Sequence, residues 1–325
     1  MSSPTAVSSS ERLPPAAQAW LANHPSVRMF WTLLRREFWE YRSLWMAPLT
    51  VSALLLLSAL FTHGALQIDA SEPSEWLDPQ IKSSIFALAQ WGLTMPLYLV
   101  MLVVLSMYLV DCMYAERKDR SILFWKSLPI GDGATVASKL CVACVVVPLG
   151  TFALALVTDV LFTLVWDLRA LIGHAPALLV WDTVAFLKTQ ALMFLGLVIS
   201  ILWYAPFFGC LLLASAWARR NVYLWVTLVP LLAIIVERIA FGTHHISSLI
   251  AYRSGGIWRS LHLESALAGS LTSVAQAAIV SVPALYDRVR IGPALTNIDL
   301  WLGLAFTAAC AYAAVWLRRY RDDSY

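Results

Sequence analysis

The chain has 325 residues, of which 60% are hydrophobic and only 13% are charged, and its formal net charge is +3. Soluble domains carry about 25% charged residues, so this composition, with a mean hydropathy of +0.70, excludes an ordinary soluble protein and indicates a helical protein with several membrane spans. Basic residues occur in short scattered groups and form no continuous basic face, which argues against nucleic acid as a partner.

The amino-terminal part reads as a tail followed by an interfacial helix. Residues 1–26 are rich in Ser, Pro and Ala and lack the apolar core of a cleaved signal peptide, so we expect a disordered cytoplasmic tail. In residues 27–43, an aromatic face is backed by arginines at helical spacing. This pattern predicts an amphipathic helix lying in the inner headgroup layer. A soluble helix packed on a partner protein is the alternative.

Six apolar segments are predicted to cross the membrane. Most Lys and Arg residues fall in the segments that this topology places inside, so we expect both termini in the cytoplasm. Residues 242–298 then form an external loop, and residues 318–325 a cytoplasmic tail. The predicted spans are 44–61, 85–111, 134–166, 183–218, 222–241 and 299–317.

One segment of the external loop is apolar enough to enter the membrane. Residues 261–282 also carry His262, Glu264 and Gln276, together with several Ser and Thr residues. We interpret them as a helix or helix pair that re-enters from outside and is buried against protein. If this segment crossed the membrane instead, there would be seven spans, and the arginines at the carboxyl end would face outward.

A dense group of charges lies between the second and third predicted spans. This cytoplasmic loop, residues 113–133, cannot sit in hydrocarbon and must lie in water beside the membrane. Four large apolar residues stand among its charges, and an exposed run of this kind needs a partner to cover it. We predict that the loop docks onto a soluble protein; an ordinary loop whose aromatic side chains lie against the membrane is the alternative. The residues expected to carry the docking are Glu116, Arg117, Lys118, Ile122, Leu123, Phe124, Trp125 and Pro129.

The order of these elements resembles the membrane subunit of an ABC-2 type exporter. The shared features are an entry helix, six spans, a charged loop between spans two and three, and re-entrant helices before span six. Glu116-Arg117-Lys118, a short aliphatic helix, Pro129 and a later Lys139 are similar to the loop of that family. At Asp119-Arg120 the chain departs from the Gly-Thr that is usual there. The match covers roughly residues 27–320.

The resemblance implies that the loop is a coupling helix seated in a groove of a separate ATPase subunit. The chain has no P-loop sequence of its own, so it is not expected to be an enzyme, and ATP and Mg²⁺ would bind to the partner. The implied assembly holds two ABC ATPases and a second permease copy or homologue. Trp- and Phe-rich spans with few buried charges favour an amphipathic, lipid-like or peptide cargo.

Four ionisable residues are predicted at a similar depth near the outer face of the membrane. Asp159 with Lys188, and Glu237 with Arg238, would form an outer gate or substrate-contact layer. Structural pairing, or side chains reaching to the interface, is the alternative.

Other classes of function find less support in the sequence. The five cysteines lie in or beside apolar segments, and neither a metal-binding cluster nor a nucleophile motif is apparent. A secondary transporter is expected to show internal repeats and buried ion-coupling carboxylates, and neither is visible. A subunit that transmits force or assists assembly without transporting anything remains open.

Overall fold

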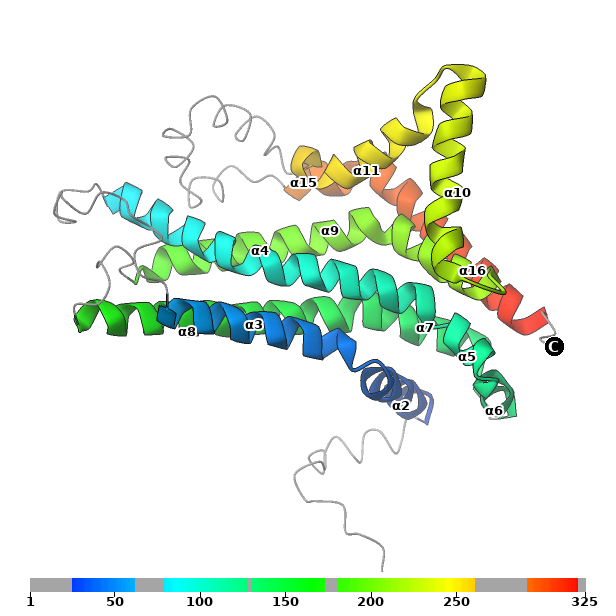
Figure 1. The fold of residues 1–325 in the computed structure, drawn as a ribbon, viewed down its shortest axis with the longest axis horizontal. Helices are drawn as coiled ribbons and strands as arrows, with labels where there is room; N and C mark the ends of the chain where they lie inside the picture. Colours follow the sequence, from blue (N-terminus) through cyan, green and yellow to red (C-terminus); the bar gives the residue numbers. More distant parts are fainter. Residues whose placement is uncertain (1–24, 62–78, 128–129, 173–180, 261–290, 321–325) are drawn as a thin grey trace, which may run out of the picture.

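A computed structural model describes residues 25–61, 79–127, 130–172, 181–260 and 291–320. All elements in these ranges are helices (Figure 1). Within these ranges, six helices are long and apolar enough to cross a membrane, and they coincide with the six predicted spans. They cover Ser43–Phe61, Ala89–Lys118, Asp132–Arg169, Thr183–Trp217, Val222–Phe241 and Ile298–Tyr320. The predicted re-entrant segment 261–282 lies outside the described residues.

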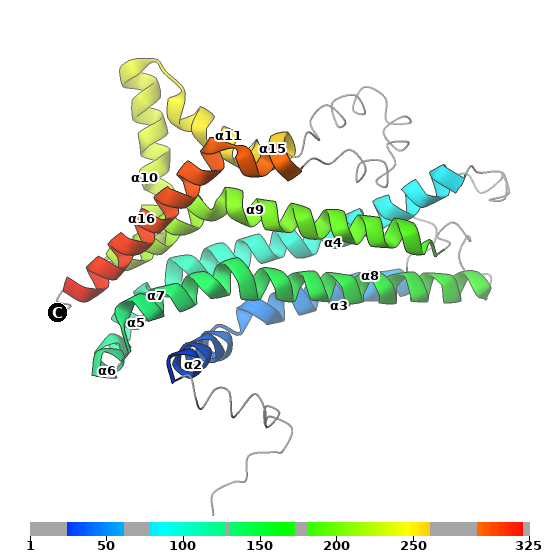
Figure 2. The same cartoon turned by 180° about the vertical axis from the view of Figure 1, so that it is seen from behind.

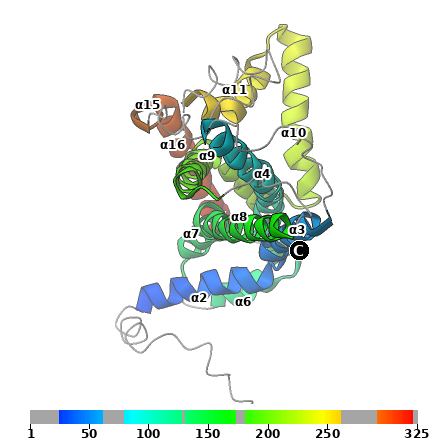
Figure 3. The ribbon, with the colours of Figure 1, turned by 90° about the vertical axis from the view of Figure 1, so that its left-hand side faces the viewer.

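The first half of the chain forms an entry helix, two spans and a bent tip. The elements are α2 (Pro25–Glu40), α3 (Ser43–Phe61), α4 (Pro79–Asp111), α5 (Tyr114–Lys118) and α6 (Ser121–Ser127). The predicted amphipathic helix is present as α2, and a short turn separates it from α3. Helix α2 lies across the end of the bundle (Figure 3) and buries Leu33. Trp31 and Phe38 remain exposed.

The third span is continuous but distorted near its start. Helix α7 (Asp132–Cys141) passes through a π-helical turn, η3 (Val142–Val146), into α8 (Val147–Leu171). Because Pro148 has no amide hydrogen to donate to the preceding turn, a wider turn just before it accommodates the missing bond. The distortion therefore lies directly beside Pro148.

A bundle of long helices forms the centre of the molecule. Helices α3, α4, α8 and α9 (Thr183–Trp217) run alongside one another, and α16 (Ile298–Tyr320) packs obliquely on α9 (Figures 1 and 2). Leu105, Leu109 and Leu212 are fully buried between them. Close approach of α16 requires glycine: a Cβ built at Gly303 would lie 2.9 Å from Cγ of Pro206.

The fifth candidate span leaves this bundle at a steep angle (Figures 1 and 3). Helix α10 (Val222–Val236) continues into the π-helical turn η4 (Glu237–Phe241), and Val222 is its one buried residue. Helix α11 (His245–Ser260) returns toward the bundle and packs on α9. A short helix, α15 (Ile291–Thr296), precedes α16. The apolar surface of α10 is therefore left for lipid or another chain to cover.

One end of the bundle gathers the segments that the sequence predicts to be cytoplasmic. Helices α2, α5 and α6, the start of α7 and the end of α16 lie there together (Figure 2). Helices α2 and α16 both pack on α7. Segments far apart in the sequence thus meet at the tip that carries the charged loop.

Candidate functional site

The charged loop is organised by a carboxylate that points inward. Glu116 on α5 is 1% exposed. Its Oε2 accepts a hydrogen bond from Nη1 of Arg318 at 2.5 Å, and its Oε1 lies 3.1 Å from Nζ of Lys139 and 3.2 Å from Nη2 of Arg36. Three cations from α2, α7 and α16 thus converge on one acidic side chain of the loop.

A second buried carboxylate extends the network toward α4. Nζ of Lys139, which is fully buried, donates to Oε1 of Glu37 at 2.8 Å, and the hydroxyl of Tyr108 donates to Oε2 of Glu37 at 2.9 Å. The ring of Tyr41 meets that of Tyr108 edge-on at 4.9 Å. Burial, more than the neighbouring acidic groups, raises the pKa of Tyr41, so its phenol stays neutral beside Glu37.

The rim of the network adds two further contacts. Nε of Arg318 donates to Oδ1 of Asp132 at 3.0 Å, which fastens the end of α16 to the start of α7. Arg36 pairs with Glu40 at 2.9 Å, and its guanidinium carbon lies 3.8 Å from the centroid of the Trp125 ring. A cation over an indole face is attracted by the ring quadrupole, so α2 holds the aromatic surface of α6 directly.

Two buried carboxylates, Glu37 and Glu116, therefore face two buried cations, Lys139 and Arg318. Removing charges from water costs several kcal/mol each, and this cost is offset only when every member is paired. We call these four residues the tip network. Because each of them lies on a different helix, their pairing fixes the positions of α2, α5, α7 and α16 relative to one another.

The junction between α4 and α5 is tied separately to α9. The backbone amides of Met113 and Tyr114 both donate to Oγ of Ser215 at 3.1 Å. Nη2 of Arg117 donates to the carbonyl oxygens of Ser215 and, at 2.9 Å, Ala218. These carbonyls are at the carboxyl end of α9, where a helix has unpaired acceptors and a partial negative charge.

Only part of the predicted docking set is presented at the surface. We expected every residue of this set to be available to a partner. Glu116 and Ile122 are instead buried, and Arg117 and Trp125 are half-buried and contact other parts of the chain. Phe124 is 60% exposed, and its ring packs edge-on against Trp125 at 5.2 Å.

The exposed face around Phe124 is basic at its edges, because Lys118 and Lys126 are also exposed. We call these three residues the α6 surface. The side chain of Leu123 and the whole of Pro129 lie outside the described residues.

Sequence reasoning missed Glu37 and Arg318 as members of the tip network. Arg318 was read only as a signal for the inside of the membrane. Glu37 is one of two acidic residues of α2, and the sequence does not distinguish it, which is buried, from Glu40, which lies at the rim.

The four outer residues do not form the predicted pairs. Asp159 is fully buried on α8, and its Oδ2 accepts from Nε2 of Gln190 at 2.7 Å, in place of Lys188. Glu237 accepts from Oγ1 of Thr243 at 2.9 Å and from the amides of His245 and Ile246 at 2.5 and 2.8 Å. Glu237 therefore caps the first turn of α11.

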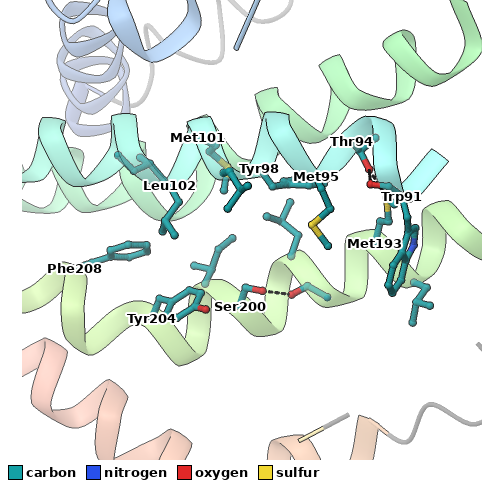
Figure 4. A pocket seen from close by; sticks show the side chains of 16 residues that line it. Trp91, Thr94, Met95, Tyr98, Met101, Leu102, Met193, Ser200, Tyr204 and Phe208 are labelled. Atoms are coloured by element: carbon teal, nitrogen blue, oxygen red, sulfur yellow. Dashed lines mark hydrogen bonds between the residues drawn. The ribbon is translucent and has the colours of Figure 1, made fainter. Parts of the chain in front are cut away.

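A separate cavity of about 300 Å³ lies between α4 and α9 (Figure 4). Its walls are mostly apolar, and Met95, Tyr98 and Phe208 point into the space between the two helices (Figure 4). Among the described residues, the hydroxyl of Tyr98 and the indole nitrogen of Trp91 have no hydrogen-bond partner. Both atoms are closed off from solvent, so the cavity is in effect an apolar chamber.

Metal ligands are not assembled anywhere in the ranges that the structure describes, since no three His, Cys, Asp or Glu side chains come together there.

Comparison of the chain with known protein families, with curated proteins and with solved structures found no match.

Proposed function

We propose that the chain is the transmembrane permease subunit of an ATP-driven, ABC-2 type exporter in a bacterial inner membrane. Two separate ATPase subunits would supply the energy, carrying ATP and Mg²⁺, and a second permease copy or homologue would complete the pathway. The observation that carries this proposal is the tip network, in which Glu116 of the charged loop is bonded to Lys139 and Arg318, together with the contact of Arg36 to the same carboxylate.

The network suits a part that receives force at one end of the bundle. A partner that seats Phe124 would push on α6, and α6 is held by the contact of Trp125 with Arg36. The push then reaches α7 and α16 through Glu116, and α9 through Arg117. A small displacement at a rigid tip moves whole helices, because packed elements shift as units and do not deform continuously.

The cavity between α4 and α9 supports an amphipathic cargo. Ligand sites of this kind are concave and mostly apolar, and a few polar groups fix orientation. At about 300 Å³ the cavity is at the lower end of the size range for small-molecule sites. The apolar part of such a cargo would fit against the apolar walls of the cavity.

Association with an ATPase tests the proposal. The full-length chain would be co-expressed with a candidate subunit that carries a P-loop and an ABC signature, and the complex would be purified in detergent. Phe124→Asp places a charge at the centre of the α6 surface and is expected to abolish co-purification and ATPase stimulation. Tyr320→Asp is the matched control, because Tyr320 is a 62% exposed aromatic residue at the same end of the bundle.

Unchanged association of Phe124→Asp would contradict docking through α6. Loss of association with both variants would show that any added acidic charge at this end is disruptive, and would equally remove the support for a specific contact.

A further inference from the structure

Three helices bring together polar groups that the proposed function does not use. Asp159 on α8 and Gln90 on α4 are 0% and 3% exposed, and both line a cavity of about 10 Å³ closed by Phe86, Leu93 and Phe162. Gln190 on α9 joins them through its hydrogen bond to Oδ2 of Asp159.

The hydrogen bonding of this site is incomplete. Within the described residues, Oδ1 of Asp159, both amide atoms of Gln90 and Oε1 of Gln190 have no partner. The acceptors without a partner are three oxygens, and the only donor left over is Nε2 of Gln90. Buried polar groups in native proteins are nearly always paired, so a missing ligand should provide what these oxygens lack.

The charge of the site is also uncompensated. Asp159 forms no ion pair with any Lys, Arg or His of the described residues. Uncharged polar groups lie on the helices around it: Tyr98 on α4, Thr163 on α8, and the pair of hydroxyls from Ser52 on α3 and Thr158 on α8. The same helices carry Asp167, Arg169 and Lys188, but none of these pairs with Asp159, and Arg169 donates to the carbonyl oxygen of Ala59. An isolated carboxylate in such a place is costly unless it binds a proton or a cation.

We propose that this cavity is a binding site for one monovalent cation, a proton or Na⁺, held by the carboxylate of Asp159 with the amide oxygen of Gln90, while Gln190 orients the carboxylate from outside the cavity. The volume has room for about one small species. A divalent ion is disfavoured because the site provides a single carboxylate, whereas Ca²⁺ takes 6–8 oxygen ligands that usually include several acidic groups. The site does not depend on ATPase docking and stands or falls separately from the proposed exporter function.

The test uses the purified full-length chain in lipid nanodiscs, with no ATPase present. Thermal unfolding would be followed while NaCl replaces choline chloride at constant ionic strength, and infrared difference spectra would report the carbonyl stretch of protonated carboxyl groups. If Na⁺ binds, the unfolding midpoint rises with Na⁺ and not with choline. If a proton binds, a protonated carboxyl band is present without Na⁺ and is unaffected by adding it.

Asp159→Asn, which keeps the shape but removes the charge, is expected to eliminate either signal. Asp167→Asn is the control, because Asp167 is a half-buried acid farther along the same helix and should leave the signal intact. A wild-type protein that shows neither Na⁺-dependent stabilisation nor a protonated carboxyl band would overturn the proposal and leave a cavity that holds only water. This measurement is made on the wild-type protein, so its outcome does not depend on whether a variant folds.

Discussion

Single residues explain why a charge-rich segment folds back onto the bundle. Glu116 and Lys139 are fully buried, although Glu116 belongs to a loop that composition alone assigns to water and Lys139 is a charge within a predicted span. Their pairing at 3.1 Å, with Glu37 bonded to the same ammonium at 2.8 Å, replaces the hydration they lose. The tip is therefore rigid because of its charges, and hydrophobic packing by itself would not orient it.

Lys139→Met tests how much the pairing of Lys139 with Glu37 and Glu116 stabilises the protein. The variant keeps a long side chain but leaves Glu37 and Glu116 short of a partner, so we expect the free energy of unfolding to fall by about 3–5 kcal/mol. Denaturation in detergent measures the change. Lys126→Met on the exposed face of α6 should have almost no effect.

A double variant separates charge pairing from packing. Glu37→Gln removes one of the carboxylates that Lys139→Met leaves unpaired. The free energy of unfolding of the double variant should therefore fall by clearly less than the sum of the decreases in the two single variants. Strict additivity would mean that the two residues do not stabilise one another.

The residue scale is also where sequence reasoning was least complete. Glu116 and Arg117 were predicted as outward contacts, but both bond within the chain, because nothing in the local pattern shows which charges of a loop turn inward. The partners of Glu116, which are Arg36, Lys139 and Arg318, are 80, 23 and 202 positions from it by residue number. Pairing across such distances is a property of the tertiary fold.

At the scale of elements, the spans could be predicted because their apolar runs exceed the roughly 20 residues that a bilayer requires. The angle of α10 could not be predicted, since hydropathy indicates how long an apolar segment is and not in which direction it runs. The distortion beside Pro148 is a local effect of the missing amide hydrogen. The capping of α11 by Glu237 was missed, because it depends on a turn at Gly242, which has a φ of 64°.

The packing of α16 on α9 and α11 depends on Gly303. A Cβ there would lie 2.6 Å from Nη1 of Arg253 as well as 2.9 Å from Pro206, whose ring cannot move away. Gly303→Ala should therefore lower the free energy of unfolding by about 1–3 kcal/mol, despite the better helix propensity of alanine. Gly150→Ala is the control: its Cβ meets nothing within 4 Å, so a thermal midpoint equal to or above that of the parent is expected.

The first turn of α11 should loosen when its cap is removed. Glu237→Ala leaves the amides of His245 and Ile246 without an acceptor, and amide hydrogen exchange at these two positions should become several-fold faster. The neighbouring Arg238 is exposed, and Arg238→Ala should leave the exchange rates unchanged. Equal effects of the two variants would argue against capping by the carboxylate.

The whole molecule has two ends with different chemistry. Helix α2, the α6 surface and the last turn of α16 share one end, and this clustering agrees with the inside assignment drawn from Lys and Arg. Toward the other half of the bundle, Asp159, Gln90 and Gln190 lie together on three spans. In the proposed exporter, force enters at the charged end and the cation site lies apart from it.

The side of the membrane on which α6 lies is the point on which the exporter proposal depends. Lys126→Cys would be introduced into a chain whose five native cysteines are replaced by alanine, and a thiol reagent that cannot cross membranes would be applied to vesicles of both orientations. The account predicts labelling in inverted vesicles, where the cytoplasmic face is outside, and protection in right-side-out vesicles. Labelling only from the exterior of the cell would contradict it.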